Sequence, residues 1–339
     1  MDNGATMHLA VSPFAGTAAP SLGAELDFSR LARFVLKAEA AGLDMVIFAD
    51  STPASSHAAN RQLPFEATTL LAALATVTSR IGLVAAASTV AHQPYNLARR
   101  FASLDIISHG RTGWNVTMAQ DPREAANFSR PAGFLSGDFR RRTEEYIGIV
   151  QGLWNGWDAD ALLFDKSGGR FHDPEKMHLL DHKGEFFSVR GPLNVARSPQ
   201  ETPVLVLSGL SASDMDIAAR TADVVLLDDE PIDSAKTRYD DLKRRVVACG
   251  RDPDAVKVLM NVSPVTDDTA KPTIADSMEK GFRSKSCDGF NIVLPAELST
   301  LDDFVDLVLP ELRRRGLFQE SYSGATLRSH LGLTPGDAA

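Results

Sequence analysis

The chain has 339 residues, of which 44% are hydrophobic and 23% are charged, which is the composition of an ordinary globular protein and disfavours a disordered chain. Its formal net charge of −9 disfavours nucleic acid or an anionic membrane as the main partner, because no excess of Lys or Arg is there to neutralise phosphates. The longest apolar run is too short to cross a bilayer and the first residues lack a signal-peptide pattern, so we expect a cytoplasmic protein that contacts no membrane.

Short β-branched segments alternate along the chain with longer amphipathic segments, a pattern typical of a parallel sheet built from βα units. The expected strands are 7–13, 44–50, 81–89, 113–118, 203–209, 223–229, 256–264 and 289–295. The expected helices are about 27–41, 66–78, 94–108, 139–154, 211–221, 232–249, 273–283 and 301–314. Eight strands and eight helices predict an α/β fold, the (β/α)8 TIM barrel.

One segment departs from this alternation. Residues 158–202 are rich in turn residues and too irregular for a βα unit, so we expect an insertion after the fourth helix, with a short strand in 186–193 that follows a turn at 182–184. Two domains are compatible with the length, but the insertion has no core pattern of its own, which favours one barrel domain over residues 1–339. We expect residues 1–5 and a C-terminal tail, 321–339, to be loosely held.

Polar residues that end the apolar strands are the candidate site, because ligands of such barrels bind at the carboxyl ends of the strands. Asn115 is the clearest candidate, since a buried amide in an apolar strand needs partners and a bound heterocycle would supply them. For Asp50 and Ser88, turn or helix-cap chemistry is an equally good interpretation. The full set is Ser12, Asp50, Ser88, Thr89, Asn115, Thr117, Ser208, Gly209, Asp228, Asp229, Ser263 and Asn291.

Small residues at 208–214 join an expected strand to an expected helix, an arrangement in which backbone N–H groups and hydroxyls can reach a phosphate. Asp214 argues against a tight anion site there. We expect no metal site: the histidines and aspartates of the insertion lack an H-E-x-x-H or C-x-x-C spacing, and Cys249 and Cys287 match neither a zinc site nor a disulfide framework. No Walker loop, G-x-S-x-G elbow or Rossmann fingerprint occurs.

Two runs, GRTGWNV at 110–116 and VRGPLNVARSPQ at 189–200, are sequence motifs highly specific for one branch of a known enzyme family. Sequence similarity to that family extends from about residue 44 to residue 333. The chain resembles the bacterial-luciferase-like flavin-dependent monooxygenases. The branch it resembles most is the one that oxidises nitrilotriacetate, dibenzothiophene sulfone and related compounds.

The resemblance implies a barrel that binds reduced FMN supplied by a separate NAD(P)H-dependent flavin reductase, and that oxygenates a small organic substrate through a flavin C4a-peroxide. A homodimer is usual in the family. Transferred to this chain, the family pattern places Asp50 next to the flavin, Ser88 beneath its ring and Asn115 at its ring edge, with residues 117–138 as a loop over it. Ser208, Gly209 and Ser211 fall at the phosphate-side turn, and no residue is assigned a catalytic role.

The phosphate-side turn departs from the family pattern A-G-S-S-x-x-G-R. Leu210 replaces a hydroxyl, Asp214 adds a negative charge, and the usual loop His and Arg-Tyr pair are missing. Arg140, Arg141 or Arg142 would have to compensate electrostatically. Two interpretations therefore stay open: a two-component FMN-dependent monooxygenase, or a luciferase-like barrel with a degenerate flavin site that acts as a binding or partner subunit.

Overall fold

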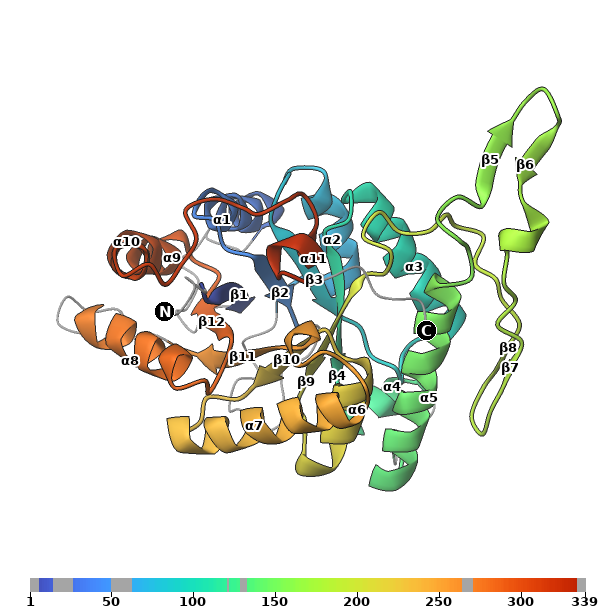
Figure 1. Ribbon diagram of the computed structural model, residues 1–339. Coiled ribbons are helices and arrows are strands. Elements are labelled where there is room, and N and C mark those ends of the chain that lie inside the picture. The colour runs from blue at the N-terminus through green and yellow to red at the C-terminus, as the bar shows by residue number, and fades with distance from the viewer. Residues whose placement is uncertain are drawn as a thin grey trace.

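A closed barrel of eight parallel strands forms the centre of the protein, in the order β1-β12-β11-β10-β9-β4-β3-β2, with helices around it (Figure 1). The computed structural model describes residues 6–14, 27–49, 63–120, 122–128, 133–263 and 271–333. The predicted fold class is therefore confirmed. The barrel strands are β1 (His8–Phe14), β2 (Met45–Phe48), β3 (Gly82–Ala86), β4 (Thr112–Thr117), β9 (Val204–Ser208), β10 (Val224–Leu227), β11 (Lys257–Val262) and β12 (Gly289–Pro295).

The eight predicted helices are present, and most boundaries agree to within a few residues. The last one begins earlier than expected and contains a π-helical segment just before Pro310, whose missing N–H interrupts the regular hydrogen bonding. Among the described residues, no helix combines the length and apolar character needed to span a bilayer. The helices are α1 (Phe28–Ala40), α2 (Ala67–Ala75), α3 (Pro94–Ile107), α5 (Ser136–Trp154), α6 (Met215–Thr221), α7 (Ile232–Ala248), α8 (Lys271–Arg283), α9 (Leu298–Asp303), η4 (Phe304–Val308) and α10 (Leu309–Arg314).

Apolar side chains fill the barrel interior, and they alternate along the strands with side chains that face the surrounding helices. The interior cluster includes Ala10, Val84, Val206 and Leu259, all fully buried. The larger outer cluster lies between the strands and helices and contains most of the Phe and Leu residues. The barrel interior toward the amino ends of the strands is therefore a packed core, and space for a ligand is expected only at the carboxyl ends of the strands.

The C-terminal segment closes the other end of the barrel. Leu327 and Leu331, in and after α11 (Leu327–His330), belong to the interior cluster, and the Leu327 side chain packs against Gly82 and Gly113 at the starts of β3 and β4. Buried Arg328 forms an ion pair with Asp223 at 2.7 Å. The prediction of a loosely held tail was thus wrong for residues 321–333, while 1–5 and 334–339 lie outside the described residues.

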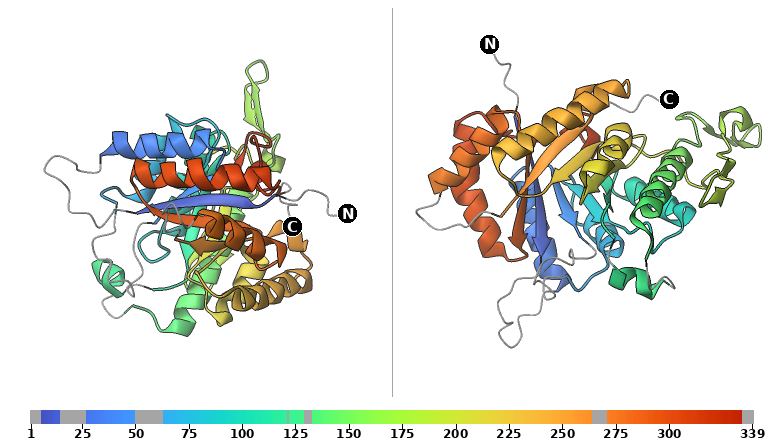
Figure 2. Two further views of the ribbon diagram at one scale, coloured as in Figure 1. Left: turned by 90° about the vertical axis from the view of Figure 1, so that its left-hand side faces the viewer. Right: turned by 90° about the horizontal axis from the view of Figure 1, so that it is seen from below.

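The insertion forms two small hairpins, β5 (Leu162–Asp165) with β6 (Arg170–His172) and β7 (His182–Lys183) with β8 (Ser188–Val189). Figures 1 and 2 show the β5–β6 hairpin extending away from the barrel. The expected strand in 186–193 is present but short. The turn lies at 184–187, not at 182–184, because the Gly184 N–H donates to the Phe187 carbonyl at 2.9 Å.

The end of the insertion is attached to the barrel by a buried polar network. The Asp105 carboxylate accepts hydrogen bonds from the Ser198 hydroxyl, from the Gln200 amide at 2.7 Å and from the Thr112 N–H at 2.9 Å. Burial raises the pKa of Asp105 to about 6, although these hydrogen bonds oppose the shift. The Gln200 carbonyl oxygen accepts from the Arg328 N–H, so the network also holds α11.

Candidate functional site

Asn115 lies near the carboxyl end of β4, where its register partners are Ala86 of β3 and Val206 of β9. Because paired residues of parallel strands point to the same face and Val206 belongs to the interior cluster, the Asn115 side chain points into the barrel. The residue is 5% exposed, and its Oδ1 has no hydrogen-bond partner among the residues that the structure describes. An orphaned buried acceptor is costly, so this oxygen is suited to receive a hydrogen bond from a ligand.

Trp114 precedes Asn115 and faces the outer layer, where it fixes the strand. Its ring nitrogen donates to the Ala87 carbonyl at 3.0 Å, and its ring lies 5.9 Å from Tyr146 and 6.3 Å from Trp154. Burial raises the pKa of the Tyr146 phenol. This aromatic packing holds β4, and with it Asn115, in one position.

A row of polar side chains lines the opposite wall of the barrel mouth. The Ser12 hydroxyl donates to Asn291 Oδ1 at 3.0 Å, and Asn291 Nδ2 donates to Asn261 Oδ1 at 2.8 Å. Ser12 and Asn291 were expected at the site, whereas Asn261 was missed. The signal for Asn261 was the same as for Asn115, a lone amide in an apolar strand.

Ser88 follows β3, and its hydroxyl is used inside its own turn. It accepts hydrogen bonds from the N–H groups of Val90 at 3.1 Å and Ala91 at 3.4 Å. This agrees with the turn-chemistry interpretation, and a flavin contact stays a prediction. Asp50 lies outside the described residues, so its position beside the flavin stays a prediction.

The turn at 208–214 lies directly beside the end of β4, since the Met118 N–H donates to the Ser208 carbonyl at 2.8 Å. Gly209 has a φ of +65°, a conformation that favours glycine. The buried Asp214 carboxylate, at the end of η2 (Ala212–Asp214), accepts from the Ser211 N–H at 2.9 Å and also from the Ser211 hydroxyl. Ser208, Gly209 and Ser211 lie in one turn, and both Ser211 donors are already used; their contact with a flavin phosphate stays a prediction.

The three consecutive arginines at the start of α5 have different roles. Arg140 is exposed and donates to the Ser213 carbonyl at 2.6 Å, so it borders the turn at 208–214. Arg141 pairs with Glu185 and Asp138 at the surface. Arg142 is buried, donates to the Thr89 carbonyl at 2.9 Å, and lies 5.0 Å and 4.8 Å from the rings of Phe134 and Phe187. Only Arg140 of the three reaches the turn, whereas Arg142 ties the loop after β3 to the insertion.

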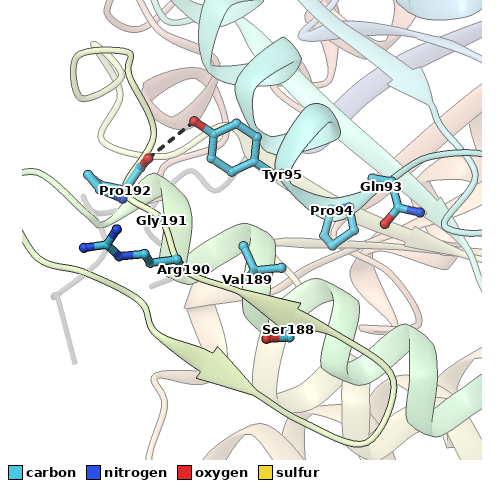
Figure 3. Close-up of a pocket in the computed structure, with 8 residues that line it drawn as sticks. All are labelled: Gln93, Pro94, Tyr95, Ser188, Val189, Arg190, Gly191 and Pro192. Carbon is cyan, nitrogen blue, oxygen red and sulfur yellow. Dashed lines mark hydrogen bonds between the residues drawn. The ribbon is translucent and has the colours of Figure 1, made fainter.

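Two cavities lie outside the ring of barrel strands. A cavity of about 400 Å³ separates the start of α3 from β8, and the Tyr95 hydroxyl donates across it to the Pro192 carbonyl at 3.4 Å (Figure 3). A second cavity of about 790 Å³ lies between Leu210 and Met215 on one side and Arg238 of α7 on the other. Neither includes Asn115, so we assign the candidate site from the orphaned amide and the strand ends.

The histidines of the insertion are engaged with carboxylates. His178 Nε2 lies 2.9 Å from Asp158 Oδ1, and His182 Nε2 lies 2.8 Å from Glu145 Oε1. Within the part of the chain that the structure describes, no three His, Cys, Asp or Glu residues converge as metal ligands.

Comparison with known proteins agrees with this geometry. Residues 7–284 match the family described as luciferase-like monooxygenase. The chain is 34% identical to N-acetyl-S-(2-succino)cysteine monooxygenase of Bacillus subtilis (strain 168), over 87% of this chain and 88% of the relative. It is also 34% identical to nitrilotriacetate monooxygenase component A of Aminobacter aminovorans, over 91% of this chain and 90% of the relative.

The fold is similar to the crystal structure of a riboflavin lyase with modified FMN and riboflavin, with a TM-score of 0.86 at 24% identity, over 97% of this chain and 96% of that one. The resemblance seen in the sequence is confirmed by the family match and by the two relatives together. The chain belongs to the family of luciferase-like, flavin-dependent monooxygenases.

Proposed function

We propose that this chain is the oxygenase component of a two-component monooxygenase. It binds reduced FMN, delivered by a separate NAD(P)H-dependent flavin reductase, at the barrel mouth and uses O₂ to oxygenate a small organic substrate. Family membership supports the reaction class, and a relative named as component A supports a separate reductase. The observation that carries the proposal for this chain is the orphaned Oδ1 of Asn115.

The residues at the mouth fit a reduced flavin ring. An amide oxygen only accepts hydrogen bonds, so its partner must be a donor, and the reduced ring carries N–H groups at its edge. The opposite wall offers neutral hydroxyl and amide groups from Ser12, Asn261 and Asn291, which can orient a polar substrate without adding charge. When bound, the reduced flavin supplies the reactivity toward O₂, while the protein supplies position and the exclusion of water.

The segment 117–138 is proposed to cover the ring. It contains a short helix, α4 (Pro122–Asn127), that the sequence did not predict. Two hydrogen bonds link Gln120, near the start of the segment, to Phe134, near its end. Gln120 Nε2 donates to the Phe134 carbonyl and the Phe134 N–H donates to Gln120 Oε1, both at 2.9 Å. These two bonds join the beginning of the segment to its end, which supports its proposed role as a loop over the ligand. The proposal retains the cytoplasmic homodimer expected from the sequence, with Asp50 and Ser88 near the flavin.

A second candidate function is a binding or partner subunit without flavin chemistry. It is favoured by one observation, the Asp214 carboxylate that occupies both Ser211 donors at the phosphate-side turn. The orphaned Asn115 favours the oxygenase, because a barrel that had lost its ligand would gain stability by replacing a buried unpaired amide.

Anaerobic titration with reduced FMN separates the two candidates. The oxygenase predicts binding at micromolar concentrations, and Asn115→Ala should weaken it by about 1–3 kcal/mol because the ring N–H loses its acceptor. Asn155→Ala is the matched control, since Asn155 is an exposed amide at the end of α5, and it should bind like the wild type. Absence of binding at millimolar reduced FMN would support the partner subunit.

A further inference from the structure

The turn at 208–214 already holds an anion of its own. A phosphate bound at such a turn would need backbone N–H groups and hydroxyls that point at it. Here the Ser211 N–H and the Ser211 hydroxyl both donate to Asp214, whose side chain is only 7% exposed. Ser211 and Asp214 thus satisfy one another in a capping box, and the two Ser211 donors that a phosphate could use are occupied.

The charge of the Asp214 carboxylate also disfavours a phosphate at this turn. An incoming phosphate would approach a buried carboxylate of like sign, which is unfavourable at short range. Two described arginines contact the turn, and both are already engaged. Arg140 is exposed and its Nη1 donates to the Ser213 carbonyl at 2.6 Å. Arg238 Nη2 donates to the Leu210 carbonyl at 3.2 Å, and Arg238 is paired with Glu230 at 3.3 Å. A second acid, Asp216, follows in the first turn of α6, and it is paired with Arg245 at 2.5 Å.

Neutral groups dominate the adjacent strand ends instead. Thr117 and Ser208 are register partners at the ends of β4 and β9. A Cβ on Gly209 would lie 3.5 Å from the Thr117 methyl carbon, so the Gly209 backbone lies beside the Thr117 side chain. Hydroxyls of this kind suit a chain of alcohol groups, because each alcohol both donates and accepts.

From these contacts we propose that the site does not select its flavin by the terminal phosphate. It holds the ring and the ribityl chain, and it binds a flavin with an uncharged, hydroxyl-terminated tail, of the riboflavin class, about as tightly as FMN. This inference rests on the proposed function and deepens it, since it concerns the tail of the same cofactor. Asp214 is the residue that sets the preference.

The test is a pair of binding titrations, with FMN and with riboflavin, followed by quenching of flavin fluorescence. For the wild type, the two dissociation constants should agree to within about threefold. Asp214→Asn keeps an acceptor for the Ser211 N–H and removes the charge, so FMN should bind about tenfold more tightly while riboflavin is unchanged. Unchanged riboflavin binding also shows that the variant is folded.

Asp233→Asn is the matched control, because it removes one negative charge from an exposed position of α7 outside the turn, and it should leave both affinities unchanged. The inference is overturned if the wild type binds FMN about thirtyfold or more tightly than riboflavin, or if Asp214→Asn leaves their ratio unchanged. Those results would leave the proposed oxygenase standing. If neither flavin binds in the oxidised or the reduced form, the proposed function fails and this inference fails with it.

Discussion

Replacing Asn115 by Leu should separate the stability of the protein from its affinity for flavin. In the free protein the buried Oδ1 of Asn115 has no partner among the described residues, and such a group costs about 1–3 kcal/mol of folding free energy. A Leu of similar size removes that cost, so the free energy of unfolding should stay unchanged or rise by about 1 kcal/mol. Flavin affinity should fall by about 1–3 kcal/mol, which is roughly 5- to 150-fold.

Asn291→Leu provides the contrast, because both ends of the Asn291 amide are hydrogen bonded, to Ser12 and to Asn261. Its loss should lower the free energy of unfolding by about 1–3 kcal/mol. Urea unfolding followed by circular dichroism measures both variants, and the anaerobic titration measures binding. The reasoning is refuted if Asn115→Leu is destabilised as much as Asn291→Leu, since the Asn115 amide would then have a partner within the protein.

Three further predictions concern the frame that holds the site. The pKa of Asp105 is raised in the folded state from its ordinary 3.8 to about 6. As pH rises through that window, the free energy of unfolding of the wild type should therefore fall by about 2–3 kcal/mol relative to that of Asp105→Asn. Urea unfolding at several pH values measures this difference, and a difference that does not depend on pH would contradict the prediction. Arg328→Met should lower the free energy of unfolding by about 3–5 kcal/mol, because it leaves the buried Asp223 carboxylate without its ion-pair partner. Thermal unfolding measures this loss, and a loss below about 1 kcal/mol would contradict a stabilising role of the pair. Gly148 is an exposed position of α5 where a Cβ would have no neighbour within 4 Å, so Gly148→Ala should stabilise the protein by about 0.5–1 kcal/mol. Gly209→Ala should destabilise it by a similar amount, because Gly209 has a φ of +65°. Urea unfolding midpoints measure both variants, and equal effects would contradict the argument.

The barrel was predictable because its signals are local. Each strand is a short apolar run, and each helix has its own amphipathic pattern and end signals, such as Asp27, whose side chain caps α1, and Gly42, which follows it with positive φ. The role of residues 321–333 was not predictable in this way. Leu327 and Leu331 lie in a segment with little helical pattern, and the surface that buries them exists only once the barrel has closed.

The candidate site was predictable to the extent that strand periodicity decides which face a side chain occupies. Asn115 follows from its position in β4, and the same reasoning would have identified Asn261 in β11. The use of Asp214 required the geometry of the turn, because a sequence shows an acid near a phosphate turn but not which donors it occupies. The Asp105 network joins residues about ninety positions apart, and no local pattern predicts such a contact.

The most direct test of the central claim is a crystal structure of the protein with bound flavin. We expect the ring across the mouth of the barrel, with a ring N–H within about 2.7–3.2 Å of Asn115 Oδ1. A ring bound elsewhere, or an Asn115 amide that contacts only protein groups while flavin is present, would contradict the account.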